Sequence, residues 1–183
     1  MFSITSCSKD DDEQVSPPVT YMEENPLAKY YENTGFTTVT NFVNSGDYEF
    51  GLVFSPSVKG KINSITVKIP DSNPNLRITI WDYTTKTVLR SEIVNVSASN
   101  TLITKNISEL SLEKDKKYMI TMNSNDWYKK SKSNNSNATY PVAAGNIQFW
   151  EYRWLSGTAQ TFPTNISSDY NAGDLSFNFQ QVN

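Results

Sequence analysis

The stretch that decides the fold is INSITVKI, residues 62–69. Its apolar residues Ile65, Val67 and Ile69 alternate with polar ones, so they share one face of an extended chain. The segment LRITIW at residues 76–81 repeats the pattern. Alternation with a period of two is typical of strands that bury one face, and it predicts a β-rich body.

Further segments extend this pattern along most of the chain. Strands are predicted over residues 48–54, 62–69, 76–81, 88–96, 101–107, 118–122, 147–152 and 175–179. Turn-forming sequences rich in Pro, Gly, Asn and Asp separate them. We find no helical stripe longer than two turns and no internal repeat. The prediction is an all-β domain over residues 36–183, formed by two packed antiparallel sheets as in a jelly-roll or immunoglobulin-like sandwich.

The composition excludes several kinds of chemistry. The 183 residues include no histidine and one cysteine. A Ser-His-Asp or Cys-His nucleophile therefore cannot be assembled, and neither can a zinc site of the Cys/His kind. Carboxylate chemistry and calcium sites built from oxygen ligands stay open, and we expect no cofactor.

The charge is uneven along the chain. Residues 1–35 hold seven acidic and two basic side chains, a net charge of −5, whereas the remainder holds 14 Lys or Arg and 12 Asp or Glu, a net charge of +2. The main cationic cluster is Lys129, Lys130 and Lys132. A nucleic-acid-binding domain usually has a much stronger basic footprint, so we expect no nucleic-acid partner.

The N-terminus carries an address signal. Ile4-Thr5-Ser6-Cys7 resembles a bacterial lipobox, in which the cysteine is lipidated, and the acidic run at residues 8–13 resembles the export tag of surface lipoproteins from Bacteroides-type bacteria. The apolar stretch of a full signal peptide does not precede it. Residues 1–7 are therefore interpreted as a truncated signal peptide, and residues 8–35 as an acidic flexible tether, of which residues 27–31 could pack on the domain. The alternative is a disordered tail with an incidental cysteine.

The body also resembles a family. The stretches EFGLVF (49–54), GKI (60–62), ITIWD (78–82), KYMI (117–120), ATYPV (138–142) and DYNAGDL (169–175) are similar to those of an uncharacterised β-sandwich domain of extracellular bacterial proteins. Such domains are often joined to glycan-processing or adhesion modules. The resemblance implies a location outside the cell and a sandwich fold. It carries over no catalytic residues.

Two aromatic segments are the candidate ligand sites. Residues 124–146 are predicted to form a long loop, in which Asn125, Asp126, Trp127 and Tyr128 combine flat rings with hydrogen-bonding groups. That combination suits sugar recognition, because the apolar face of a pyranose stacks on a ring. The alternative is a mobile surface loop whose aromatic side chains anchor it to the sandwich.

The second segment is FWEYRW, residues 149–154. Strict alternation would place Trp150, Tyr152 and Trp154 on one face and Phe149 and Glu151 on the other. One face should be core, and the other could be an exposed aromatic platform for a glycan or a partner protein. The competing interpretation is a central strand covered on both sides.

Acidic residues near turns are candidates for calcium binding or hydrolysis. Two clusters could offer oxygens to calcium, although turn formation explains them equally: Asp71, Asn73 and Asn75, and Asp169, Asn171 and Asp174. A glycosidase needs two carboxylates across a cleft, and Glu151 with Asp126 or Asp82 could form such a pair.

These observations lead to one ranked hypothesis. The chain is predicted to be a non-enzymatic surface lipoprotein, anchored to the outer membrane through lipid on Cys7, that binds a glycan. The first alternative is a structural or adhesive protein that docks a protein partner. The second is a small hydrolase that uses paired carboxylates.

Overall fold

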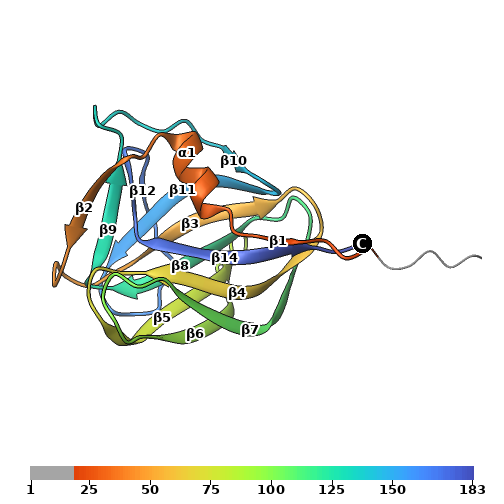
Figure 1. The fold of residues 1–183 in the computed structure, drawn as a ribbon, viewed down its shortest axis with the longest axis horizontal. Helices are drawn as coiled ribbons and strands as arrows, with labels where there is room; N and C mark the ends of the chain where they lie inside the picture. Colours follow the sequence, from red (N-terminus) through yellow and green to blue (C-terminus); the bar gives the residue numbers. More distant parts are fainter. Residues whose placement is uncertain (1–18) are drawn as a thin grey trace, which may run out of the picture.

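Antiparallel pairing joins nearly the whole described chain into β-sheets. The computed structural model describes residues 19–183 (Figure 1). In chain order, its elements are β1 (Glu23–Glu24), α1 (Leu27–Thr34), β2 (Thr38–Phe42), β3 (Tyr48–Pro56), β4 (Gly60–Lys68), β5 (Asn73–Asp82), β6 (Val88–Val96), β7 (Ile103–Leu112), β8 (Tyr118–Ser124), β9 (Trp127–Ser131), β10 (Val142–Ala144), β11 (Ile147–Ser156), β12 (Asn165–Ser167), β13 (Tyr170–Ala172) and β14 (Asp174–Gln181). The prediction of an all-β fold is confirmed, and all eight predicted strands are present.

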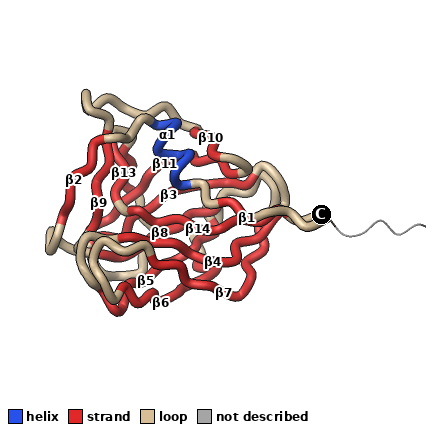
Figure 2. Tube along the Cα trace, viewed as in Figure 1, coloured by secondary structure: helices blue, strands red, loops and turns tan. Residues whose placement is uncertain are grey.

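The strands form two main sheets and one small one. The first sheet has the order β1-β14-β4-β7, and the second has the order β10-β11-β3-β8-β5-β6, with β12 also paired to β11. A third sheet, β13-β9-β2, stands beside them (Figures 1 and 2). The architecture is therefore the predicted two-sheet sandwich, with an added small sheet.

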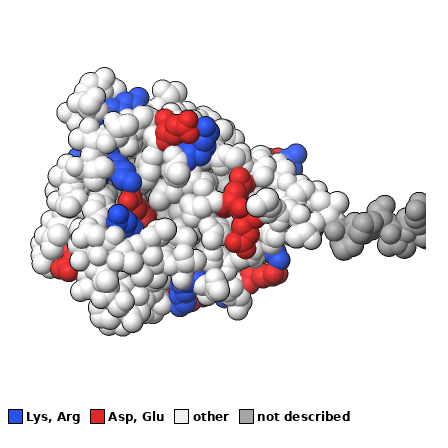
Figure 3. All heavy atoms as spheres, viewed as in Figure 1, with Lys and Arg blue, Asp and Glu red and all other residues white. Residues whose placement is uncertain are grey.

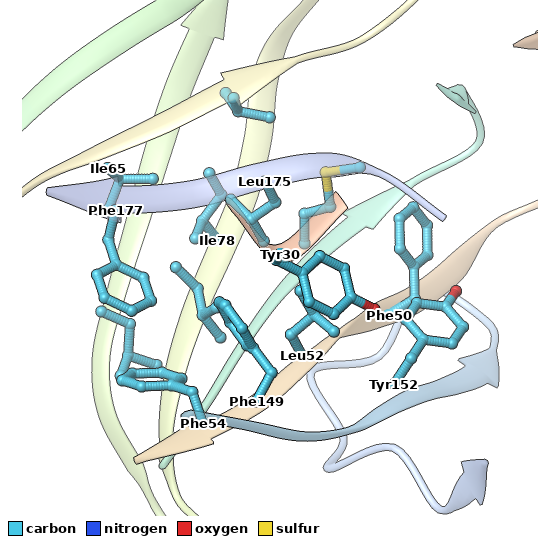
Figure 4. Packing of buried hydrophobic residues seen from close by; sticks show 14 of the residues in the cluster. Tyr30, Phe50, Leu52, Phe54, Ile65, Ile78, Phe149, Tyr152, Leu175 and Phe177 are labelled. Atoms are coloured by element: carbon cyan, nitrogen blue, oxygen red, sulfur yellow. The ribbon is translucent and has the colours of Figure 1, made fainter. Parts of the chain in front are cut away.

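The core fills the space between the two main sheets. Side chains from the two layers point toward one another, as Figure 4 shows for Phe54 of β3 and Phe177 of β14. The centroids of these two rings lie 4.5 Å apart. Ile65 and Val67 of the opening motif are both buried here, as the alternation predicts.

The outer face of the second sheet is also covered. Thr79 and Thr121, which alternation assigns to the opposite face from the core, are fully buried. The segment 157–164 lies over them: the Gln160 amide donates to the Thr79 hydroxyl, and Phe162 packs against Trp81. The centre of this sheet is thus buried on both sides, a feature that a period-two pattern alone does not predict.

The expected domain boundary at residue 36 is too late. β1 pairs with β14, and Asn25 donates to Thr66 of β4. Helix α1 inserts Tyr30, which has no exposed surface, against Phe149 of β11, with ring centroids 4.8 Å apart. The acidic charge of the segment led the prediction toward a tether, but its few apolar residues are enough to hold it on the domain. Residues 8–18 of the predicted tether lie outside the described residues.

The long loop predicted at residues 124–146 is wrong. It contains β9, which pairs with β2 and β13, and β10, which pairs with β11. Strand β9 has the sequence WYKKS, which shows no apolar alternation. Its partners lie about 90 residues before it and 40 after it along the chain, so only the tertiary fold brings them together.

Helix α1, eight residues long, is the one helix of residues 19–183. No helix in this part of the chain has the length and apolarity required to cross a bilayer.

Candidate functional site

A cleft opens where the small sheet meets the second main sheet. Its volume is about 220 Å³. Its walls come from β2, β3, β9, β11 and β13 and are mostly aromatic. The lining residues are Phe42, Tyr48, Phe50, Trp127, Lys129, Tyr152, Trp154, Tyr170 and Ala172.

Strand register explains why these rings meet. Trp154 of β11 lies opposite Phe50 of β3, and Tyr48 stands two residues before Phe50 on the same face. On the small sheet, Phe42 of β2 pairs with Trp127 of β9. Each wall therefore presents aromatic side chains at alternate positions, and the cleft lies between the walls.

Trp127 forms the floor of the cleft. Phe42 stacks on it, with ring centroids 5.5 Å apart and an interplanar angle of 12°. Tyr48 and Phe50 approach Trp127 with their edges, with centroid distances of 5.3 and 5.6 Å. Only 9% of Trp127 is exposed, so the residue shapes the cleft more than it offers an open stacking face.

The half-buried rings at the rim are the ones a ligand can reach. Trp154 meets the Tyr48 ring at a right-angle contact of 6.0 Å, and its indole N–H donates to the Ser167 hydroxyl. Tyr170 packs against Tyr152 with a centroid distance of 5.3 Å. Burial raises the pKa of both tyrosines, so their hydroxyls stay protonated at neutral pH. The rim thus combines flat rings with hydrogen-bonding groups.

Lys129 is the single charged side chain of the lining. Its ammonium nitrogen lies 4.3 Å from the centroid of the Tyr170 ring, a cation–π contact. The next residue, Lys130, points to the opposite face of β9, where its nitrogen lies 2.8 Å from the Asp174 carboxylate. Figure 3 shows that Lys and Arg on the face in view stand in small separate groups, several of them beside acidic residues.

Three of the predicted aromatic residues meet in this cleft: Trp127, Tyr152 and Trp154. Tyr128 does not. It is buried on the other face of β9, where its hydroxyl donates to Asn100 and the Lys68 ammonium approaches its ring. Burial raises its pKa.

Asn125 and Asp126 form a turn and do not line the cleft. The Asp126 carboxylate accepts a hydrogen bond of 2.7 Å from the Asn44 backbone N–H, and the Asn125 amide donates to the Asn44 side chain. Asp126 is buried. These contacts tie the β2–β3 connection to the start of β9, so both residues support the cleft wall from behind.

The predicted faces of β11 are wrong because the strand contains a β-bulge. The register against β3 shifts between Phe149 and Glu151. As a result Phe149 and Tyr152 both enter the core, and Trp154 packs on it, instead of Trp150, Tyr152 and Trp154 sharing a face.

The extra residue, Trp150, lies on the outer face of the sheet. Its indole N–H donates to Ser55, and the Lys117 ammonium lies 3.7 Å from its ring centroid. Trp150 therefore stands outside the cleft, which makes it a natural control for the cleft aromatics.

The calcium candidates are occupied by local contacts. Asp71 and Asn73 accept hydrogen bonds from the backbone N–H groups of Ser72 and Asn75. Asp174 accepts from Tyr31 and pairs with Lys130. Asp169 precedes β13 and is half-buried. Within residues 19–183, no three Cys, Asp or Glu side chains converge as a metal site would require.

The carboxylates considered for hydrolysis are also engaged elsewhere. Glu151 accepts hydrogen bonds from Tyr83 and Arg153. Hydrogen bonding from the Thr85 backbone N–H, together with Lys116, lowers the pKa of Asp82. The cleft lining contains no carboxylate, so paired acid chemistry has no position in it.

The sequence analysis missed half of the cleft. Phe42, Tyr48, Tyr170 and Lys129 line it but were not singled out as ligand-binding residues. Only Tyr48 and Phe50 carried a signal, as an aromatic pair spaced by two at the start of a predicted strand. Cys7, the predicted lipidation site, lies outside the described residues. The sequence matches no protein-family model and no curated protein.

Proposed function

We propose that the protein is a non-enzymatic binding module displayed on the cell surface, and that it holds a sugar residue of a glycan in the aromatic cleft. The observation that carries the proposal is the convergence of rings from β2, β3, β9, β11 and β13 on one open cleft. Ligand sites are usually concave, mostly apolar and equipped with a few polar groups. The cleft has this character.

The chemistry of the rim suits a pyranose. The C–H groups on one face of the sugar ring pack on the half-buried rings of Trp154 and Tyr48, because aromatic faces are electron-rich and apolar. The Tyr170 hydroxyl and the Lys129 ammonium would then hydrogen-bond the sugar hydroxyls. The volume of about 220 Å³ lies below the roughly 300 to 1,000 Å³ of drug-sized sites, so it suits one ring rather than several.

The surface location rests on the N-terminal sequence. Ile4-Thr5-Ser6-Cys7 and the acidic run after it support lipidation of Cys7 and anchorage in the outer membrane. Several acyl chains on one cysteine would hold the protein firmly, whereas one chain binds marginally. Metabolic labelling of the expressed gene product with a palmitate analogue tests this part, and an unlabelled Cys7 would refute it.

Substitution of Trp154 tests the binding function. We expect Trp154→Ala to weaken binding about fivefold or more in affinity electrophoresis against soluble polysaccharides, since an aromatic contact contributes about 1 kcal/mol. Trp154→Phe keeps a ring and should retain most of the affinity. The control Trp150→Ala removes an indole outside the cleft and should bind like the original protein. Failure of the unmodified protein to bind any polysaccharide, or an equal loss in Trp150→Ala, would contradict the proposal.

Protein docking is the second candidate. Strand β6 ends the second main sheet, and Val88, Leu89 and Ile93 on it are 44%, 40% and 51% exposed. An edge strand with exposed apolar side chains is a surface on which another chain can pair or pack. Recovery of a stoichiometric partner from membranes, lost on Ile93→Lys but kept on Trp154→Ala, would favour this function over glycan binding.

A further inference from the structure

We propose that the sugar residue held in the cleft carries an anionic group, which lies against Lys129. This inference rests on the proposed glycan-binding function and names the class of glycan. Two sources can supply the shared chemistry, the carboxylate of a uronic acid and the sulfate ester of a sulfated sugar.

The first support is the charge of the cleft. Lys129 is the one charged lining residue, and no carboxylate of residues 19–183 lies within ion-pair distance of it. By contrast, Lys130 on the opposite face of the same strand is neutralised by Asp174 at 2.8 Å. Two neighbouring lysines thus differ in their compensation, and the uncompensated one faces the cleft.

The second support is the hydrogen-bonding state of Lys129. An ammonium group has three N–H donors and no acceptor. Within the described part of the chain, Lys129 donates to no side-chain or backbone acceptor, and its ammonium is held over the Tyr170 ring at 4.3 Å. The half-buried ammonium is therefore positioned by an aromatic face while its donors stay open. An anion in the cleft would accept them with charge-assisted hydrogen bonds, which are stronger than neutral ones.

The third support is the surroundings of this charge. The rest of the lining is aromatic apart from Ala172. An ion pair that is shielded by rings is weakened less by water and salt than one on an open surface. A single charge beside stacking faces therefore favours a ligand with one anion per ring, which is the chemistry of a uronic acid or of a monosulfated sugar.

Matched trisaccharides test the inference on the full chain. The probes for isothermal titration calorimetry are trigalacturonic acid, its methyl ester, and a sulfated galactan fragment without carboxylates. The methyl ester keeps the shape of the first probe and removes its charge. We expect the acid or the sulfated fragment to bind at least about tenfold more tightly than the ester, since a hydrogen bond to a charged group contributes about 1.5 to 3 kcal/mol.

Two variants assign the effect to its residue. Lys129→Gln keeps the length of the side chain and much of its hydrogen bonding and should abolish the preference for the charged probe. Lys68→Gln is the control, because Lys68 also lies over a tyrosine ring, that of Tyr128 at 5.6 Å, but outside the cleft. It should leave the preference unchanged.

The outcomes separate the two levels of the proposal. Preference for the acid alone, or for the sulfated fragment alone, identifies the source of the anion and supports the inference. Equal binding of acid and ester, or a preference that survives Lys129→Gln, overturns the inference and leaves glycan binding intact. Binding of no probe and no neutral polysaccharide overturns both.

Discussion

The helix that precedes the sheets is an integral part of the domain, and substitution of Tyr30 tests this. Tyr30 has no exposed surface, its ring lies 4.8 Å from that of Phe149, and its hydroxyl is 2.6 Å from the Tyr140 hydroxyl. Removing a fully buried aromatic ring costs about 3 to 5 kcal/mol, which is a large part of the stability of a typical domain. We expect Tyr30→Ala to lower the free energy of unfolding by that amount.

Two further variants separate packing from other effects. Tyr30→Phe keeps the ring and removes one hydrogen bond, so it should cost about 1 kcal/mol. Lys29→Ala removes an exposed ion pair with Glu32 on the same helix and should change stability by less than about 0.5 kcal/mol.

Urea unfolding followed by tryptophan fluorescence measures all three variants. A single cooperative transition that shifts to lower urea in Tyr30→Ala is the expected result. A loss below about 1 kcal/mol for Tyr30→Ala would refute the conclusion that α1 is part of the cooperative unit, because so small an effect is incompatible with a fully buried ring.

Two other predictions concern alkaline pH and the packing of strands. Burial raises the pKa of Tyr30, Tyr31 and Tyr152 well above 10, and that of Tyr140 to about 12. The unfolded chain therefore loses protons above pH 10 that the folded chain keeps, so the free energy of unfolding should fall by up to about 1.4 kcal/mol per pH unit for each tyrosine; an unchanged urea midpoint between about pH 9 and 11 would contradict this. In Gly51→Ala the new Cβ would lie 1.9 Å from the Ile120 carbonyl oxygen of β8, and we expect a loss of about 3 kcal/mol or more in the same urea assay, whereas a stability equal to that of the original protein would refute the close approach of β3 and β8.

The sequence predicts the strands well because their signal is local. Alternating apolar side chains at residues 62–69, 76–81 and 175–179 need only one buried face, and each of these segments lies in a main sheet. The aromatic residues Trp127, Tyr152 and Trp154 were chosen for their type, and they do line the cleft. Residue type indicated which side chains a ligand site would use, but not which of them meet.

The remaining features depend on contacts between distant segments. A single bulge at Trp150 reverses the faces of β11, because one extra residue shifts every later side chain to the other side. Strand β9 exists because β2 and β13 pair with it, and the cleft exists because Phe42, Tyr48 and Tyr170 arrive from three separate strands.

The sequence by itself therefore determined the all-β class, the main strands and the absence of histidine chemistry, since these follow from local pattern and composition. Only the tertiary structure decided that residues 23–35 belong to the domain, that Tyr128 and Trp150 turn away from the cleft, and that Lys129 faces it without a carboxylate partner. The physical reason is that pairing and packing between segments far apart in the chain set the direction of each side chain, and no local pattern encodes them.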